Sequence, residues 1–142
     1  MNLFQSTLEQ KNEGRPPVWF MRQAGRYHSH YQRLKERHTF MELCQIPEIA
    51  AETAMGPVED FDFDAAILFS DLLFPLEVMG TGLRYDPGPK LDHHLHTLED
   101  VKKLTSGTEL AKKILFQKQA MEILRRRLSP TKGLIGFVGG PW

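Results

Sequence analysis

Three apolar runs of strand length alternate with amphipathic segments along the chain. The runs cover residues 17–21, 65–69 and 134–138, and each is apolar at successive positions rather than at alternate ones. Continuous apolar runs of this length are typical of parallel strands that helices cover. The pattern therefore predicts an α/β fold in which three parallel strands are separated by helices.

The segment between the first two runs carries several helix signals. Residues 31–37 are charged and are predicted to be helical. Thr39 and Glu42 have the spacing of a capping box, so a short helix is expected to begin there. Pro47 suits the first turn of a following helix. Pro57 is expected to weaken or kink the middle of that helix, because it lacks a backbone N–H group.

The segment between the second and third runs is predicted to be irregular at first and helical later. Residues 80–89 contain three glycines and two prolines, and only residues 83–85 are expected to be extended. Thr97 can begin a short helix, and Thr108 can begin a longer one. The longer helix has apolar residues at steps of three, four or seven, which predicts one face against the core. These apolar residues are Leu110, Ile114, Met121, Leu124 and Leu128.

Composition and charge restrict the partners of the chain. Its 142 residues include 18 basic and 18 acidic side chains, so no net field attracts nucleic acid or an anionic membrane. No apolar run approaches the roughly 20 residues of a membrane span, and the first residues lack the features of a signal peptide. The single cysteine excludes an internal disulfide and fits a reducing compartment. We therefore expect a cytoplasmic protein without nucleic-acid or membrane partners.

Two other groups of reactive residues have plain structural interpretations. Cys44 lies among apolar residues of a short predicted helix, which favours a buried side chain over a catalytic thiol. His93, His94 and His96 cluster after the irregular segment, but a metal site needs further ligands in a defined geometry. Solvated loop histidines are the favoured interpretation, and no metal site is predicted.

Two arginines follow the first apolar run. Arg22 and Arg26 are separated by Gln23, Ala24 and Gly25, a small bridge that is expected to let the two guanidinium groups converge. Each guanidinium carries five fixed donors and stays charged, so a converging pair suits a ligand with several carboxylates or phosphates. The alternative is that both arginines pair with acidic side chains on a surface turn.

A carboxylate stands at the exit of the second run. Asp71 follows Phe69 and Ser70 directly, where it is either a catalytic group or the cap of a loop or helix. Asp62 and Asp64 precede the run, so we expect them at its opposite end as loop or capping residues.

Three motifs together resemble the uroporphyrinogen decarboxylases of haem biosynthesis. They are MRQAGRY at residues 21–27, DAAILFSD at residues 64–71 and GFVGGPW at residues 136–142, and their order and approximate spacing also match. The resemblance implies a barrel of eight strands and eight helices, with its chemistry at the carboxyl ends of the strands. Residues 1–142 are then an incomplete, N-terminal portion that stops after the third predicted strand. One departure is His-Ser-His at residues 28–30, where the family usually has Leu-Pro-Glu.

The resemblance also implies an activity. Family members convert the four acetate side chains of uroporphyrinogen to methyl groups to give coproporphyrinogen, without a metal or organic cofactor, and full-length members are usually homodimers. Asp71 is expected to stabilise the cation formed when a pyrrole ring is protonated. Arg22 is expected to share in proton delivery, although an arginine is a poor general acid by its pKa. The implied substrate-binding residues are Arg22, Gln23, Ala24, Gly25, Arg26 and Asp71.

Two rival interpretations stay open at this stage. A corrinoid-linked methyltransferase shares the barrel and generally binds zinc through His and Cys, but the intact RQAGR and FSD motifs favour the decarboxylase. A non-catalytic tetrapyrrole-binding or structural fragment is the other rival. The later substrate-contacting tyrosine, serine and histidine of the family would lie beyond residue 142.

Overall fold

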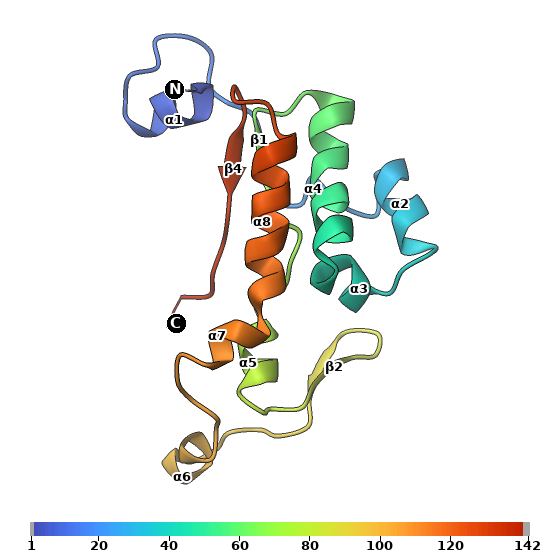
Figure 1. Cartoon of the computed structure of the whole chain (residues 1–142), viewed down its shortest axis with the longest axis vertical. Helices are drawn as coiled ribbons and strands as arrows, with labels where there is room; N and C mark the ends of the chain where they lie inside the picture. Colours follow the sequence, from blue (N-terminus) through green and yellow to red (C-terminus); the bar gives the residue numbers. More distant parts are fainter. Residues whose placement is uncertain (1, 141–142) are drawn as a thin grey trace.

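Two long helices lie side by side against a short parallel sheet (Figure 1). The computed structural model describes residues 2–140. The four central elements are α4 (Pro47–Phe61), α8 (Leu115–Arg127), β1 (Ala65–Ile67) and β4 (Gly133–Ile135). β1 and β4 run parallel, with Ala66 opposite Leu134. The parallel pairing of the second and third predicted strands is therefore confirmed, although both strands are shorter than their apolar runs.

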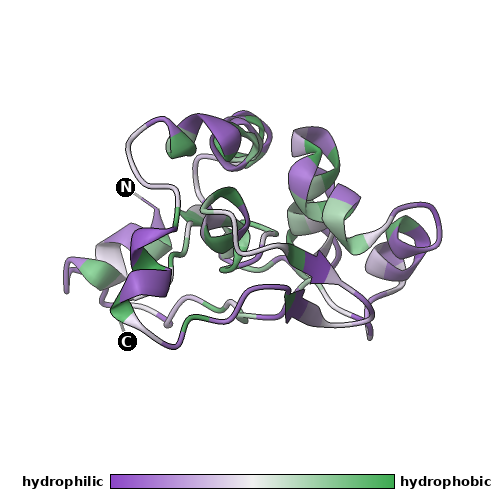
Figure 2. Ribbon diagram, turned by 90° about the horizontal axis from the view of Figure 1, so that it is seen from below, coloured by the Kyte–Doolittle hydropathy of each residue, from purple (hydrophilic) through white to green (hydrophobic). Residues whose placement is uncertain are grey.

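Small side chains allow α4 to pack closely in this core. It begins with Pro47 in its first turn and ends at Asp62, which adopts the left-handed conformation at φ 53°. The buried core residues of α4, β1 and α8 are Ala50, Ala51, Ala54, Met55, Val58, Ala66, Leu68, Ala120, Leu124 and Leu128. Apolar and polar stretches alternate along the helices of the ribbon, as expected for helices that bury one face (Figure 2). Pro57 is buried inside α4, and the helix continues past it to Phe61.

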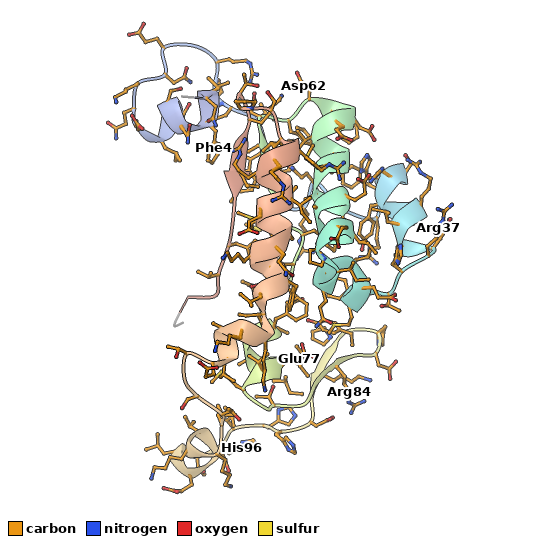
Figure 3. All side chains as sticks on the ribbon, in the orientation of Figure 1. Phe4, Arg37, Asp62, Glu77, Arg84 and His96 are labelled. Atoms are coloured by element: carbon orange, nitrogen blue, oxygen red, sulfur yellow. The ribbon has the colours of Figure 1, made fainter. Side chains whose placement is uncertain are left out.

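Three short helices flank this core. They are α1 (Leu3–Leu8), α2 (Ser29–Lys35) and α3 (Phe40–Gln45). The predicted capping box is confirmed at α3, where the Glu42 amide donates to the Thr39 hydroxyl at 3.2 Å. On α1, Phe4 lies against the start of β4, where a Cβ added to Gly133 would be 2.9 Å from the Phe4 side chain (Figure 3). Glycine at that position thus permits a close approach of α1 to the sheet.

A second group of short elements follows β1 along the chain. It comprises α5 (Phe74–Val78), β2 (Leu83–Tyr85), β3 (Pro89–Leu91), α6 (Leu98–Lys102) and α7 (Leu110–Lys113). The extended conformation predicted for residues 83–85 is confirmed, and β3 pairs with it in an antiparallel hairpin that the sequence did not indicate. Thr97 caps α6 with a complete capping box, as expected. None of the described helices combines the length and the apolar character needed to cross a membrane.

The single long helix predicted from Thr108 is wrong. The segment divides into α7 and α8 at Ile114, whose φ of −113° and ψ of 22° lie outside the helical region. The residue before α7 is Glu109, and its side chain makes no cap hydrogen bond. The apolar periodicity is nevertheless partly confirmed, because Leu124 and Leu128 are buried in the core.

The first predicted strand is also wrong. Residues 17–21 form no strand, and 58% of Phe20 and 75% of Met21 are exposed. Only one backbone hydrogen bond of strand type holds the segment, from the Asp64 amide to the Val18 carbonyl at 2.9 Å. An apolar run becomes a strand only where neighbouring backbone and a covering layer are present. Within residues 2–140 the parallel sheet accordingly has two strands rather than three and does not close into a barrel.

Candidate active site

Asp71 lies in the loop that leaves the carboxyl end of β1. The carboxylate is half-buried, and its Oδ1 atom accepts a hydrogen bond from the Leu73 amide at 2.8 Å. This bond fixes one oxygen atom just before α5 begins. No hydrogen bond to the second carboxylate oxygen is found within residues 2–140. Asp71 therefore caps its loop, as one sequence interpretation expected, and keeps an oxygen atom available for a ligand.

An aromatic cluster includes Phe69, which lies two residues before this carboxylate in the chain. Ring centroids are separated by 5.7 Å for Tyr31 and Phe69, 6.2 Å for Phe40 and Phe69, and 4.9 Å for Phe40 and Tyr85. Burial, and after it the negative charge of Asp71, raises the pKa of the Cys44 thiol to about 12. The thiol is therefore protonated near neutral pH, in agreement with the prediction of a buried rather than a catalytic cysteine.

Gln23 anchors the arginine loop. Only 1% of Gln23 is exposed, its Nε2 atom donates to the Ala65 carbonyl at 3.0 Å, and its Oε1 atom accepts from the Phe20 amide at 3.1 Å. The loop carbonyl of Gln23 in turn accepts from the Tyr27 hydroxyl at 2.5 Å. The prediction of a small, flexible bridge is therefore wrong at its first residue, because Gln23 is buried and both polar atoms of its side chain form hydrogen bonds.

Gly25 completes the tight turn between the two arginines. A Cβ atom at this position would lie 3.2 Å from the Arg22 carbonyl oxygen, so only a glycine lets the chain pass without a shift of its neighbour. The Gly25 carbonyl then accepts from the His28 amide at 2.9 Å, just before α2. Ala24 is half-buried between these anchored positions.

The two arginines are exposed and line different hollows. Arg22 lies at an apolar hollow of about 740 Å³ lined also by Phe20, Met21, Tyr27, Phe61 and Phe63. Arg26 lies at a hollow of about 610 Å³ that Lys35 and Arg37 also line. Figure 3 shows Arg37 at the outer side of α2. The structure therefore does not bring the two guanidinium groups into one cavity, although one short loop carries both.

The basic hollow is continuous with the aromatic surround of Asp71. Its walls include Tyr31 and Phe40, which also belong to the aromatic cluster, together with Pro87 beyond β2. Arg26, Lys35 and Arg37 form no ion pair within 4 Å among the residues that the structure describes. Of the two acidic residues in the lining, Glu42 is held by the Thr39 amide at 2.7 Å, which lowers its pKa. Three basic side chains and two acidic ones line this hollow, so its lining has a small excess of positive charge.

Asp64 acts at the other end of β1. Arg15 donates to both of its oxygen atoms, at 2.6 and 2.8 Å, and the Val18 amide donates to Oδ2 at 2.7 Å. The hydrogen bond from Arg15 is the main reason that the pKa of Asp64 falls to about 2. Asp62 ends α4 and contacts Lys132. Both aspartates thus have structural roles away from Asp71, in agreement with the sequence analysis.

His28 and His30, which stand where the family usually has other residues, pack on α4. His28 is buried, and its Nε2 atom lies 2.7 Å from an Asp60 carboxylate oxygen. His30 covers Gly56, where an added Cβ would be 2.4 Å from the imidazole ring. α2 still begins at the next residue, Ser29. These two histidines therefore help to dock α2 on α4.

Two further features are the histidine cluster, which the sequence analysis considered, and Tyr85, which it did not identify. His93, His94 and His96 lie between β3 and α6, and no group of three possible metal ligands is found among the described residues. Tyr85, by contrast, was not identified from the sequence, although it ends the segment expected to be extended. The sequence feature that could have identified Tyr85 is its position: it is an aromatic residue with a hydroxyl group at the end of a short strand in a glycine-rich segment.

Comparisons with known proteins show which sequences the chain resembles. The sequence model of the uroporphyrinogen decarboxylase (URO-D) family matches residues 1–142. The chain is 46% identical over 128 residues to a uroporphyrinogen decarboxylase of Geotalea uraniireducens, covering 90% of this chain and 38% of the relative. It is 41% identical over 141 residues to that of Carboxydothermus hydrogenoformans, covering 98% and 40%.

A solved structure shares the fold at lower identity. A methyltransferase from Methanosarcina mazei superposes with a TM-score of 0.57 at 21% identity, over 72% of this chain and 34% of that protein. The chain spans about two fifths of the length of the curated relatives that it matches. Because the family's sequence model covers all 142 residues, the chain belongs to the uroporphyrinogen decarboxylase family.

Proposed function

We propose that this chain forms the amino-terminal part of a cytoplasmic uroporphyrinogen decarboxylase that is a homodimer at full length. The complete enzyme removes CO₂ from the four acetate side chains of uroporphyrinogen III to give coproporphyrinogen III. It does so without a metal or an organic cofactor. One observation carries the proposal: Asp71 presents a partly free carboxylate beside an aromatic cluster at the carboxyl end of β1.

The reaction needs an electron sink within the substrate. Protonation of a pyrrole carbon next to the acetate-bearing carbon produces a ring cation. The bond between the acetate methylene and its carboxylate then breaks, CO₂ leaves, and the electron pair neutralises the ring as an exocyclic double bond. Protonation of the exocyclic carbon and loss of the first proton restore the pyrrole, which now carries a methyl group. The protein must therefore stabilise a positive charge on the ring.

Asp71 is the group of this chain that meets that requirement. Its available oxygen can accept the pyrrole N–H groups, whose hydrogen bonds strengthen as the ring becomes cationic. The surrounding aromatic rings restrict water, which increases the electrostatic effect of the carboxylate. The stabilisation is realised on the cation more than on the neutral substrate, so it lowers the barrier rather than the dissociation constant.

The arginine loop supplies recognition of the eight substrate carboxylates. Arg26, with Lys35 and Arg37 beside it, offers positive charge in the hollow that adjoins the aromatic cluster. Arg22 lies on the apolar side of the same loop, where a guanidinium can bind one carboxylate while neighbouring rings contact the macrocycle. The backbone of Ala24 and Gly25 lies between them. Gln23 contributes by holding this loop against β1. We also propose that Arg22 takes part in proton delivery.

The test is a chimera that supplies the rest of a family member. The 142 residues are fused to the remaining part of the Geotalea uraniireducens relative, beyond the region that they match. Under anaerobic conditions, coproporphyrinogen formed from uroporphyrinogen is oxidised and measured by fluorescence. We expect turnover by the chimera and a loss of roughly 10²-fold or more in kcat for Asp71→Asn, with little change in KM. Asp86→Asn, an exposed carboxylate in the turn between β2 and β3, is the matched control.

Three outcomes would contradict the proposal. Full turnover by a folded Asp71→Asn chimera would remove Asp71 from the mechanism. A folded chimera that binds uroporphyrin but forms no product would favour the non-catalytic tetrapyrrole-binding alternative. Zinc in stoichiometric amount together with methyl-transfer activity would favour the methyltransferase alternative.

A further inference from the structure

The hydroxyl group of Tyr85 is buried without a hydrogen-bond partner. Tyr85 is the last residue of β2, and its ring packs on Phe40 with a centroid distance of 4.9 Å. The hydroxyl oxygen is shielded from solvent and makes no hydrogen bond within residues 2–140. A phenylalanine could fill the same space without a buried polar group. The hydroxyl therefore needs an acceptor nearby to offset the loss of its contact with water.

Three acidic groups influence the phenol electrostatically from neighbouring elements. They are Asp71 in the loop after β1, Cys44 on α3 and Glu77 on α5. The Cys44 thiol is protonated, and Glu77 already accepts a hydrogen bond from the Gln45 amide at 3.3 Å. Figure 3 places Glu77 on α5, close to the β2 hairpin. Of the three, Glu77 has the weakest influence on the phenol, whereas Asp71 has the strongest and keeps one carboxylate oxygen without a hydrogen bond within residues 2–140, so Asp71 is the favoured acceptor.

The direction of the pKa shift agrees with this assignment. Burial first, and then the contact and charge of Asp71, raise the pKa of the Tyr85 phenol above its ordinary value. The phenol is therefore protonated at every working pH and acts as a donor. One oxygen atom of Asp71 is occupied by the Leu73 amide, so a second donor would fix the plane of the carboxylate.

We propose that Tyr85 is a positioning residue for Asp71: its hydroxyl donates to the carboxylate and holds it in the orientation that accepts the pyrrole N–H groups. The inference rests on the proposed decarboxylation, and it adds a residue to that site. The Leu73 amide and the Tyr85 hydroxyl then hold Asp71 from the backbone side and from the hairpin side.

The contact itself is tested without substrate. The 142-residue chain is labelled with 3-fluorotyrosine, the Tyr85 signal is assigned with Tyr85→Phe, and the ¹⁹F signals are titrated with pH. We expect the Tyr85 phenol to ionise roughly one pH unit lower in Asp71→Asn than in the wild type, because a neighbouring negative charge has been removed. Tyr31 is the internal control, because Cys44 and Arg26 influence its pKa and Asp71 does not. An unchanged Tyr85 titration in Asp71→Asn would overturn the proposal.

The positioning role is tested by kinetics in the chimera. Tyr85→Phe should lower kcat by about tenfold to a hundredfold with little change in KM, the range expected for a lost hydrogen bond to a charged group. Asp86→Asn changes the exposed residue next to Tyr85, outside both hollows, and should leave kcat unchanged. Equal kcat values for the wild type and Tyr85→Phe would overturn the positioning role. Absence of turnover in the wild-type chimera would instead overturn the proposed decarboxylation, and the fluorine titration would still decide whether Tyr85 contacts Asp71.

Discussion

The side-chain amide of Gln23 donates to the carbonyl oxygen of Ala65 at 3.0 Å, so a buried hydrogen bond fixes the arginine loop to the first residue of β1. The same side chain accepts from the Phe20 amide, which shapes the chain before Arg22. One buried residue thereby sets the distance between the basic loop and the strand that leads to Asp71. The relative placement of the two functional segments depends on this link.

Replacing Gln23 with leucine should destabilise the chain. The substitution keeps similar volume but leaves the Ala65 carbonyl and the Phe20 amide without partners, which costs about 1 to 3 kcal/mol for each buried group. Urea denaturation followed by circular dichroism measures the change. Gln119→Leu on the exposed face of α8 is the control and should alter the unfolding free energy by less than about 0.5 kcal/mol. Equal stability of the two variants would contradict the anchoring role.

The pairing of Arg15 with Asp64 should make stability depend on pH. The folded-state pKa of Asp64 is lowered to about 2, below its unfolded value, so its contribution is present above about pH 4 and is lost as the pH falls toward 2. We expect the free energy of unfolding of Asp64→Asn at pH 7 to be lower than that of the wild type by about 1 to 2 kcal/mol. This figure is smaller than the pKa shift alone would give, because solvent screens the exposed Arg15 side chain. Denaturation at pH 7, 4 and 2 tests this.

The difference between wild type and Asp64→Asn should then shrink as the pH falls through about 2, where Asp64 becomes protonated in the folded state. Asp86→Asn serves as a control with an exposed carboxylate. A constant difference across the whole pH range would show that the aspartate acts through shape rather than charge.

Alanine at Gly56 should destabilise the chain only when His30 is present. In an ordinary helix, Gly→Ala stabilises by about 1 kcal/mol. Here the added Cβ would lie 2.4 Å from His30 Cδ2, and the ring would have to leave its position 3.2 Å from Glu52. We expect a loss of about 1 to 3 kcal/mol in the wild-type background.

In the His30→Ala background, the same Gly56→Ala change should be neutral or stabilising. A double-mutant cycle from urea denaturation gives the coupling between the two positions. Additive effects would mean that α2 does not dock on α4 through His30.

Local signals in the sequence were sufficient for several elements. The capping boxes at Thr39 and Thr97 involve only residues three positions apart, so the start of each helix could be predicted from the local sequence. The run after Asp64 forms a strand because β4 pairs with it. The run at residues 17–21 looks alike in sequence but has no paired neighbour, so its pattern alone was insufficient.

Long-range contacts account for the parts of the site that sequence did not predict. Gln23 was expected in a flexible bridge, and its partner Ala65 lies 42 positions away. Tyr85 approaches Asp71 only because β3 turns β2 back into a hairpin. The separation of Arg22 and Arg26 into two hollows likewise depends on α2 and α4, whose packing cannot be inferred from an RxxxR motif.

Lysine in place of Arg26 should weaken porphyrin binding. A guanidinium binds a carboxylate through two parallel hydrogen bonds, whereas an ammonium group offers a point charge. We expect the dissociation constant of uroporphyrin, measured by fluorescence titration, to rise by roughly tenfold for Arg26→Lys. Arg33→Lys, at an exposed position of α2 outside the hollow, is the control. Unchanged affinity and salt dependence in Arg26→Lys would exclude this arginine from carboxylate recognition.

The 142-residue chain by itself should associate in solution. Large apolar side chains are exposed around the hollow beside Arg22, with 58% of Phe20, 75% of Met21 and 50% of Phe61 accessible. Within the described residues, the outer edges of β1 and β4 pair with no further strand. Exposed apolar surface next to unpaired backbone favours edge-to-edge association.

Light scattering across a concentration series should therefore show a mass that rises with concentration. Phe20→Ser with Met21→Ser should reduce the association without loss of helix content, because neither side chain belongs to the core. Exposed Leu98 on α6 provides the matched control, since Leu98→Ser removes an apolar side chain away from that hollow and should leave the association unchanged. A single monomeric mass at every concentration, with slowly exchanging amides in β1 and β4, would show instead that these residues form a closed domain with stable sheet edges.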